Sequence, residues 1–258
     1  MLDPDVHKYS NMQYYYYLKI LVVLPLLTLF VILSMYTSTD KWWILYGILL
    51  YYPFHQLGWS IGMHKLFSHR SFTPVSWYPL VAVVISSICF YGLPVVSVAT
   101  HRLHHKYSES LEDADKDPHS PCISRWHSFA GWLLTYRFPS DVRDYVKDIN
   151  RDFKFLQSYN QIELFVPIVF HTTTYFISPT LFLVCLLASL LSFYSSLFIN
   201  AYSHDPKTAK ALNKKWLSWI VNPAFMHKYH HDFPKDYDFS HNGFVDYSAF
   251  IIDKFLKK

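Results

Sequence analysis

The stretch His101-Arg-Leu-His-His105 decides the fold of this chain, and His227-Lys-Tyr-His-His231 repeats its pattern near the C-terminus. Residues three and four apart share one face of an α-helix, so each stretch directs three imidazole rings to one side. Two more clusters, His64-Lys-Leu-Phe-Ser-His69 and Asn200-Ala-Tyr-Ser-His204, bring the total to nine of the chain's fifteen histidines.

The other two clusters use different spacings. Asn200 and His204 are four residues apart, so a helix places them on one face. His64 and His69 are five residues apart. We expect their rings to converge only near a helix end or where the helix is partly unwound. This cluster directly follows an apolar stretch, which agrees with a helix end.

The nine histidines form a candidate ligand set for metal ions. Neutral imidazole binds iron, zinc, copper and nickel. One tetrahedral zinc ion takes four ligands, so nine nitrogens suit two ions with four or five each. Iron is the redox metal best matched to oxygen chemistry on such a nitrogen-rich site, and we predict no catalytic residue beyond the metal centre. The predicted ligands are His64, His69, His101, His104, His105, His204, His227, His230 and His231, with Asn200 binding directly or through a water.

Apolar stretches over residues 18–36, 42–62, 164–181 and 183–203 predict four membrane-spanning helices, with a turn near Ser178-Pro179. Nineteen helical residues extend about 29 Å, which matches one hydrocarbon core. Aromatic residues make up 19% of the chain and charged residues only 16%, a composition that suits interfacial aromatic belts. The mean hydropathy is only +0.10, so a large water-facing part must balance the spans.

The segment 78–99 is apolar, but its hydropathy does not decide whether it crosses the membrane. A single crossing would place the first two histidine clusters on opposite faces, and about 20 residues are needed for each crossing. We therefore expect the segment to lie in the interface or to dip in and return. The predicted fold is a single all-α membrane domain over residues 1–258. It has four spans in two hairpins, and a cytoplasmic helical cap over 100–160 and 204–258 holds the metals.

Positive charge predicts the orientation of this domain. Of 23 lysines and arginines, 11 lie in residues 64–160 and 9 in 204–258, whereas Lys41 stands alone in the opposite turn. The positive-inside rule then places both termini and both charged segments in the cytoplasm, with the endoplasmic reticulum and a bacterial inner membrane as possible hosts. The net charge of +4 is too small and too scattered to indicate nucleic-acid binding.

The same clusters, with their flanking residues, resemble the membrane fatty acyl desaturases of the stearoyl-CoA desaturase type over residues 40 to 255. The first box continues as Arg70-Ser71-Phe72, and the second is followed by Asp115-Lys-Asp-Pro-His119. Gly131-Trp-Leu-Leu134 matches a further family motif, and the third box continues as Asp232-Phe-Pro234.

The resemblance implies two iron ions bound by the nine histidines, with Asn200 acting through a water, and a kinked tunnel beside them. It further implies that molecular oxygen is the co-substrate and that a cis double bond is inserted into a saturated acyl chain, usually at the ninth carbon. Four positions depart from the family pattern, namely Ser97, Thr100, Phe129 and Ala201. None is a predicted ligand, and the first three bear on recognition of the headgroup or chain.

Two groups of residues near the clusters have possible roles. Tyr52, Gln56 and Ser60 lie at four-residue spacing before His64, and we predict that they line the substrate tunnel, although plain helix packing also explains Gln56. Asp117 and His119 follow the second cluster and could orient ligands or cap the loop.

The partners and the reaction class stay partly open. The chain has no haem-binding or iron–sulfur motif, so we expect a separate electron donor, by resemblance a cytochrome b5 or a ferredoxin. The acyl chain could be carried by coenzyme A, a carrier protein or a lipid. The alternatives are a related histidine-box membrane hydroxylase or oxidase, and a membrane protein that binds or conducts metal ions without catalysis.

Overall fold

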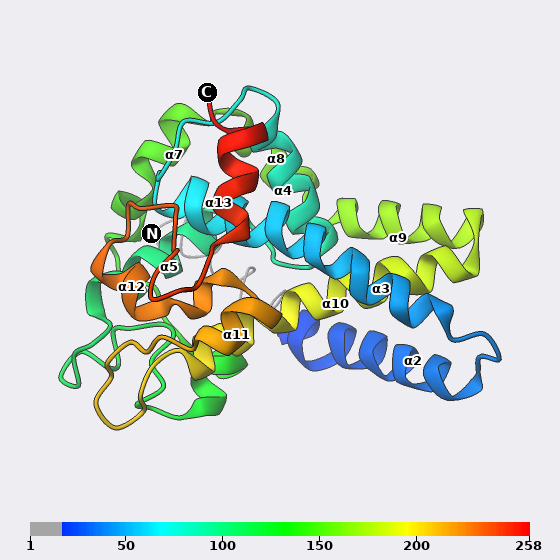
Figure 1. Cartoon of the computed structure of the whole chain (residues 1–258), viewed down its shortest axis with the longest axis horizontal. Helices are drawn as coiled ribbons and strands as arrows, with labels where there is room; N and C mark the ends of the chain where they lie inside the picture. The colour runs from blue at the N-terminus through cyan, green and yellow to red at the C-terminus, as the bar shows by residue number, and fades with distance from the viewer. Residues whose placement is uncertain (1–16) are drawn as a thin grey trace, which may run out of the picture.

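The computed structural model describes residues 17–258, and the regular secondary structure over that range is helical, with only isolated β-bridges between extended segments. Helices α2, α3, α9 and α10 project together to one side, and the remaining helices gather at the other end of the molecule (Figure 1). The all-α prediction is therefore confirmed. The N-terminus, which the charge pattern places in the cytoplasm, lies outside the described residues.

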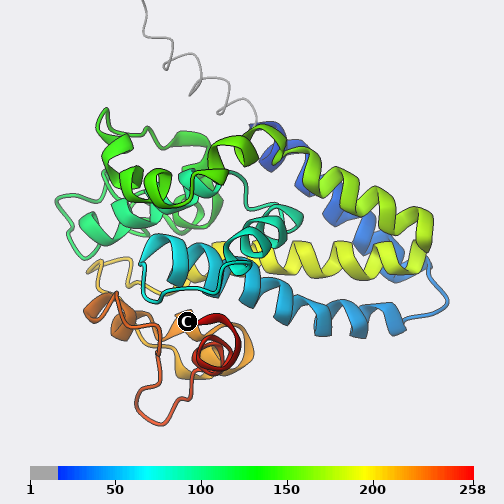
Figure 2. The same ribbon diagram turned by 90° about the horizontal axis from the view of Figure 1, so that it is seen from above.

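Within residues 17–258, two helices are long and apolar enough to cross a membrane. The first runs over Lys19–Thr37 and consists of the π-helix η1 (Lys19–Val23) and the α-helix α2 (Leu24–Thr37). The second is α10 (Pro179–Tyr202), with 24 residues and a mean hydropathy of 2.2 over its most apolar window. α10 packs against α2, α3 and α9, and so forms the centre of the projecting bundle (Figure 2).

A third long helix changes its type along its length. It begins as α3 (Trp42–Phe54) and continues without a break as the π-helix η2 (His55–Ser68). The change follows Pro53, which has no backbone N–H to donate. π-Helices are rare and occur mainly at functional sites. Here the π-helix carries the first histidine cluster, and the helix extends beyond the predicted end at residue 62.

The last apolar stretch divides at Ser178. α9 (Phe165–Ile177) ends one residue before it, and Pro179 begins α10, where its missing N–H is tolerated. The Ser178 hydroxyl accepts a hydrogen bond from the Leu181 backbone N–H. The turn at Ser178-Pro179 is thus confirmed, and the predicted boundary at 181–183 was placed a few residues too late.

The ambiguous segment 78–99 is not one element. It contains α4 (Tyr78–Ile88) and the first turns of α5 (Pro94–Tyr107), which carries the second histidine cluster. The break between them contains Phe90 and Gly92, both at positive φ. α4 has only 11 residues, too few to cross a membrane. It packs against η2 at Gly62, where an added Cβ would lie 2.8 Å from the Cβ of Ala82.

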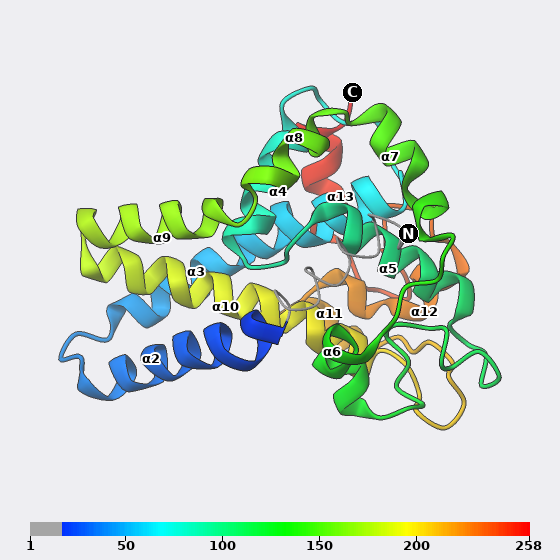
Figure 3. The same cartoon turned by 180° about the vertical axis from the view of Figure 1, so that it is seen from behind.

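The rest of the chain forms short helices in the cap, where α5, α6 and α12 lie near one another (Figure 3). A buried apolar cluster beneath η2, α4 and α5 includes Ile252 and Leu256 of the C-terminal helix. The cap helices are η3 (His127–Gly131), α6 (Trp132–Thr135), η4 (Val142–Val146), α7 (Lys147–Asp152), α8 (Phe155–Ile162), α11 (Lys215–Ile220), η5 (Pro223–Phe225), α12 (His227–Asp232), α13 (Tyr247–Ile251) and η6 (Ile252–Leu256).

Candidate metal centre

All nine clustered histidines converge in the cap, in two groups whose ligand nitrogens lie within 4.8 Å of one another. Rings from η2, α5 and α12 form the first group, and rings from α5, α12 and the residue after the C-cap of α10 form the second. The five-histidine group is His64, His69, His101, His105 and His230, and the four-histidine group is His104, His204, His227 and His231.

The π-helix η2 explains how His64 and His69 meet despite a spacing of five. A π-turn is closed by a hydrogen bond between residues five apart, so such residues lie one turn from each other. The His69 backbone N–H donates to the His64 carbonyl over 3.1 Å, and the two ring centroids are 4.9 Å apart. His69 is also the C-cap of η2, as a helix end requires.

Helices α5 and α12 each serve both groups. In α5, His101 and His105 face the five-histidine group and His104 faces the other. In α12 the division is reversed, because His227 and His231 face the four-histidine group. Each HxxHH motif therefore sends its i, i+4 pair to one group and its remaining histidine to the other.

The contacts between Nε2 atoms test whether each group fits a metal ion. In the five-histidine group, His230 Nε2 lies 3.0 Å from His64 Nε2 and 2.8 Å from His105 Nε2. In the four-histidine group, His227 Nε2 lies 3.0 Å from His204 Nε2 and 3.1 Å from His231 Nε2. Two nitrogens about 2.1 Å from one ion, at right angles as seen from it, lie about 3.0 Å apart. The residues present thus fit two ions.

Hydrogen bonds at Nδ1 orient the rings of the four-histidine group. The Nδ1 of His104 contacts Asp117 Oδ1 at 2.8 Å, and that of His204 contacts the Ala209 carbonyl at 2.7 Å. The two remaining Nδ1 atoms contact the Ala224 carbonyl and the Ser108 hydroxyl. A proton on Nδ1 leaves the Nε2 lone pair free for a metal ion. Asp117 is thus placed to orient a ligand, one of the two roles considered for it.

Aromatic packing surrounds the central rings of the five-histidine group. The Nδ1 atoms of His64 and His230 are buried without a hydrogen-bond partner in residues 17–258. Trp59 stacks on His64 at 5.2 Å and 5°, and the Phe239 ring lies 4.9 Å from His230 and 6.0 Å from His64. Sequence reasoning missed Trp59 because it assumed α-helical spacing, although Trp59 is five residues before His64.

Burial keeps most of the nine clustered imidazoles neutral. It lowers the pKa of His69 to about 3 and that of His204 to about 4. Neutral imidazole is the form that binds metal, so these rings are in their metal-binding form near pH 7. Burial also holds the pKa well below 6.5 for His101, His105, His227, His230 and His231.

A pocket that is partly open to solvent adjoins the centre. Its polar wall contains His64, His101 and the predicted ligand Asn200, together with the buried His119. Neither ring nitrogen of His119 has a hydrogen-bond partner in the described chain. The apolar wall consists of Trp59, Met63, Tyr91, Val96, Trp132, Leu133, Phe193 and Leu197.

The predicted tunnel residues lie outside this pocket. The Tyr52 hydroxyl donates to the Ile220 carbonyl over 2.7 Å, and Gln56 Nε2 donates to the Tyr247 hydroxyl over 3.2 Å. Ser60 is fully buried. The pocket is instead lined from η2 by Trp59 and Met63. A tunnel role for Tyr52, Gln56 and Ser60 stays a prediction.

Comparison with known proteins adds independent information. The model of the fatty acid desaturase family matches residues 40–241. An sn-1 stearoyl-lipid 9-desaturase of Anabaena variabilis is 39% identical over 44% of the chain and 41% of its own length. An acyl-CoA Delta(11) desaturase of Trichoplusia ni is 28% identical over 84% of the chain and 66% of its own length. An acyl-CoA desaturase of Ovis aries is 27% identical over 80% of the chain and 62% of its own length.

Proposed function

The chain belongs to the fatty acid desaturase family, and we propose that it is an oxygen-dependent desaturase that inserts a cis double bond into a saturated fatty acyl chain. The observation that carries the proposal is the pair of converging histidine groups beside a largely apolar pocket. We assign the bond to the ninth carbon. Two relatives are named for action at the ninth and eleventh positions, so product analysis must decide between them.

We propose two iron ions as the cofactor, one in each histidine group. The ions would supply the reduction and activation of molecular oxygen that removes two hydrogens from adjacent methylenes. The protein would fix the ligand rings, and Asn200, which is on the last turn of α10 and in the pocket wall, would act through a water. Burial around the histidines excludes bulk water, which limits side reactions.

The pocket supports an acyl substrate. Methylenes differ little in reactivity, so the position of the new bond must be set by how the chain is held. Trp59 and Met63 of η2 line one side of the pocket, and Phe193 and Leu197 of α10 line another. His64 and His101 lie in the same wall, so a chain bound there would pass beside the five-histidine group.

We propose that α2, the α3–η2 helix, α9 and α10 all span a bilayer. Large exposed apolar side chains on a projecting bundle need a lipid environment. α9 has only 13 residues, about 20 Å, so flanking residues or a thinned bilayer must complete its crossing. The exposed residues are Leu26, Leu29, Phe30, Ile32 and Leu33 on α2, Leu45, Tyr46, Ile48 and Leu49 on α3, and Phe165, Ile168, Val169, Phe176 and Ile177 on α9.

The remaining parts of the function follow from this assignment. A separate donor, of cytochrome b5 or ferredoxin type, would supply two electrons. The acyl chain would arrive on coenzyme A, a carrier protein or a lipid, and the relatives include both acyl-CoA and acyl-lipid desaturases. Both termini and the cap would face the cytoplasm of the endoplasmic reticulum or a bacterial inner membrane.

Expression in a desaturase-deficient host tests the function, with His104→Ala as the control. A new monounsaturated acid that is absent from the control is expected, and derivatisation followed by mass spectrometry places its double bond. A hydroxylated product would indicate the related oxygenases instead. An expressed, iron-loaded protein that consumes no oxygen with either type of donor would indicate a metal-binding protein without catalysis.

A further inference from the structure

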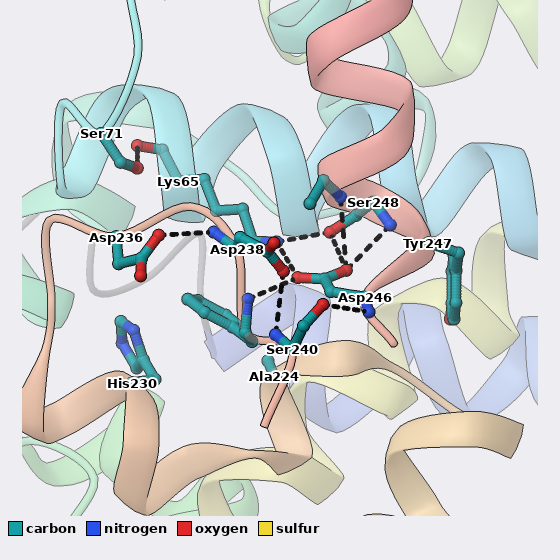
Figure 4. A network of polar contacts seen from close by, with 12 residues as sticks. Lys65, Ser71, Ala224, His230, Asp236, Asp238, Ser240, Asp246, Tyr247 and Ser248 are labelled. Carbon is teal, nitrogen blue, oxygen red and sulfur yellow. Dashed lines mark hydrogen bonds and ion pairs between the residues drawn. The ribbon is translucent and has the colours of Figure 1, made fainter. Parts of the chain in front are cut away.

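Lys65 lies within the first histidine box, yet its side chain points away from the metal centre. Its ammonium group contacts Asp246 Oδ2 at 2.6 Å, and both side chains are 0% exposed. It also donates to the Ser248 hydroxyl. Figure 4 shows Lys65 reaching from η2 toward Asp246 and Ser248 at the start of α13. A buried ion pair is costly unless all of its hydrogen bonds are made.

The Asp246 carboxylate organises the chain around it. Its Oδ1 accepts hydrogen bonds from the Ser248 backbone N–H over 2.8 Å and from the Ser248 hydroxyl over 2.6 Å. Its Oδ2 accepts a third from the Phe239 backbone N–H over 3.1 Å. The ion pair therefore fixes the first turn of α13 and the backbone of Phe239 against η2.

Phe239 connects this ion pair to the metal centre. The Lys65 ammonium lies 4.2 Å from the centre of the fully buried Phe239 ring, a favourable cation–π distance. The same ring contacts His230 and His64. Within the five-histidine group, these are the two histidines whose Nδ1 atoms are buried without a hydrogen-bond partner among the described residues.

We propose that Lys65, Asp246 and Phe239 form a positioning unit that orients His64 and His230 through ring packing. In the four-histidine group, hydrogen bonds at Nδ1 orient the histidine rings instead. The inference rests on the proposed metal centre, and none of the three residues is itself a ligand. If this unit orients His64 and His230, the five-histidine group forms fully only when the segment 239–248 packs against η2.

Metal binding by the full-length, detergent-solubilised protein tests the proposal. Phe239→Leu removes the ring but keeps an apolar side chain, and Phe244→Leu is the matched control. Phe244 is buried in the same apolar cluster as Phe239 and packs against Trp219. Metal-free protein is titrated with cobalt(II), whose absorption spectrum reports the ligands, and iron content per chain is measured after iron loading.

The expected result is selective loss of one ion. Phe239→Leu should weaken one of the two binding steps by roughly ten- to hundredfold, the usual effect of losing an outer partner of a metal-bound histidine. The cobalt spectrum of the other step should not change. Phe244→Leu should keep both steps. Lys65→Met should resemble Phe239→Leu, and Lys65→Arg, which keeps the positive charge, should keep both ions.

Three outcomes would overturn the proposal. These are unchanged binding in Phe239→Leu, equal losses in Phe239→Leu and Phe244→Leu, and a wild-type protein that binds fewer than two ions. A wild-type protein that binds two ions but forms no double bond would refute the proposed function alone. The positioning role would then still be decided by the metal titration.

Discussion

The two histidine groups sit side by side in the cap but are held by different means. In the four-histidine group, three of the four Nδ1 atoms contact a residue within 13 positions along the chain, such as Ala209 for His204 and Ala224 for His227. In the five-histidine group, packing comes from Phe239, far from His64 in sequence. Hydrogen bonds fix a tautomer locally, whereas packing needs a distant segment to dock. The two groups should therefore respond differently to mutation.

The groups also differ in their position relative to the pocket. His64 and His101 of the five-histidine group line it, and no member of the four-histidine group is among its described lining residues. The group that depends on packing is thus the one beside the proposed substrate. An acyl chain in the pocket would contact Trp59, which stacks on His64, so substrate binding can influence this group directly.

The largest expected effect comes from removing the central ring of either group. His230 Nε2 and His227 Nε2 each contact two other ligand nitrogens. We expect His230→Ala and His227→Ala each to lose one iron and all detectable desaturation, as measured by iron content and fatty-acid analysis.

His241→Ala is the control for these variants, because His241 is exposed and stacks on Tyr229 outside both groups. It should keep both irons. Loss of both irons from either central variant would show that the two groups do not bind their ions independently.

Acid should lower the folding stability of the protein through both groups, because both contain buried neutral histidines. The folded-state pKa is lowered to about 3 for His69 and to about 4 for His204, from 6.5. The unfolded chain therefore binds more protons below pH 6.5, and each such group costs up to about 1.4 kcal/mol of stability per pH unit as pH falls.

Thermal unfolding of the metal-free protein at pH 8, 7, 6.5 and 5.5 measures this effect. The unfolding temperature should be nearly constant between pH 8 and 7 and should fall steeply from pH 6.5 to 5.5. Iron release should follow the same window in both groups. A protein that is equally stable at pH 5.5 and 8 would contradict the burial of neutral imidazoles.

The sequence predicted which histidines converge more completely than the arrangement around them. Spacing on a helix placed three rings of α5 on one face, and the structure brings them to the centre. The division of each HxxHH motif between two groups did not follow from spacing, because it depends on how α5 and α12 cross. Phe239 and Asp246 could not be predicted, since their roles come from the docking of a segment far along the chain. The four proposed spans illustrate the same limit, because hydropathy marks apolar stretches but does not show the π-helical continuation to Ser68.

Asp117→Asn should have the next largest effect, and on the four-histidine group alone. The carboxylate contacts His104 Nδ1 at 2.8 Å and also accepts from the His119 backbone N–H over 2.9 Å. An amide keeps the shape but weakens the acceptor for Nδ1. We expect roughly ten- to hundredfold weaker binding of one ion.

Cobalt titration of Asp117→Asn, alone and combined with Phe239→Leu, measures this change in binding. If the two groups are independent, each single variant weakens the binding of one ion and the double variant weakens the binding of both. Weakened binding of the same ion by both changes would show that the two groups are not held by different contacts.

The smallest expected effect concerns the pocket beside the five-histidine group. Phe193 on α10 is buried in its wall, so Phe193→Ala should enlarge the pocket without touching a ligand. A change of one methylene in an apolar pocket alters discrimination roughly tenfold or more, and we expect the preference to move toward longer acyl chains by about that factor. The product ratio from mixed saturated acyl chains measures the change, with iron content expected to stay at the wild-type value.

Tyr52→Ala is the informative comparison, because Tyr52 lies outside the pocket. If Tyr52→Ala moves the chain-length preference and Phe193→Ala does not, then the acyl chain follows the face of the α3–η2 helix that carries Tyr52, and the pocket beside His64 has another role.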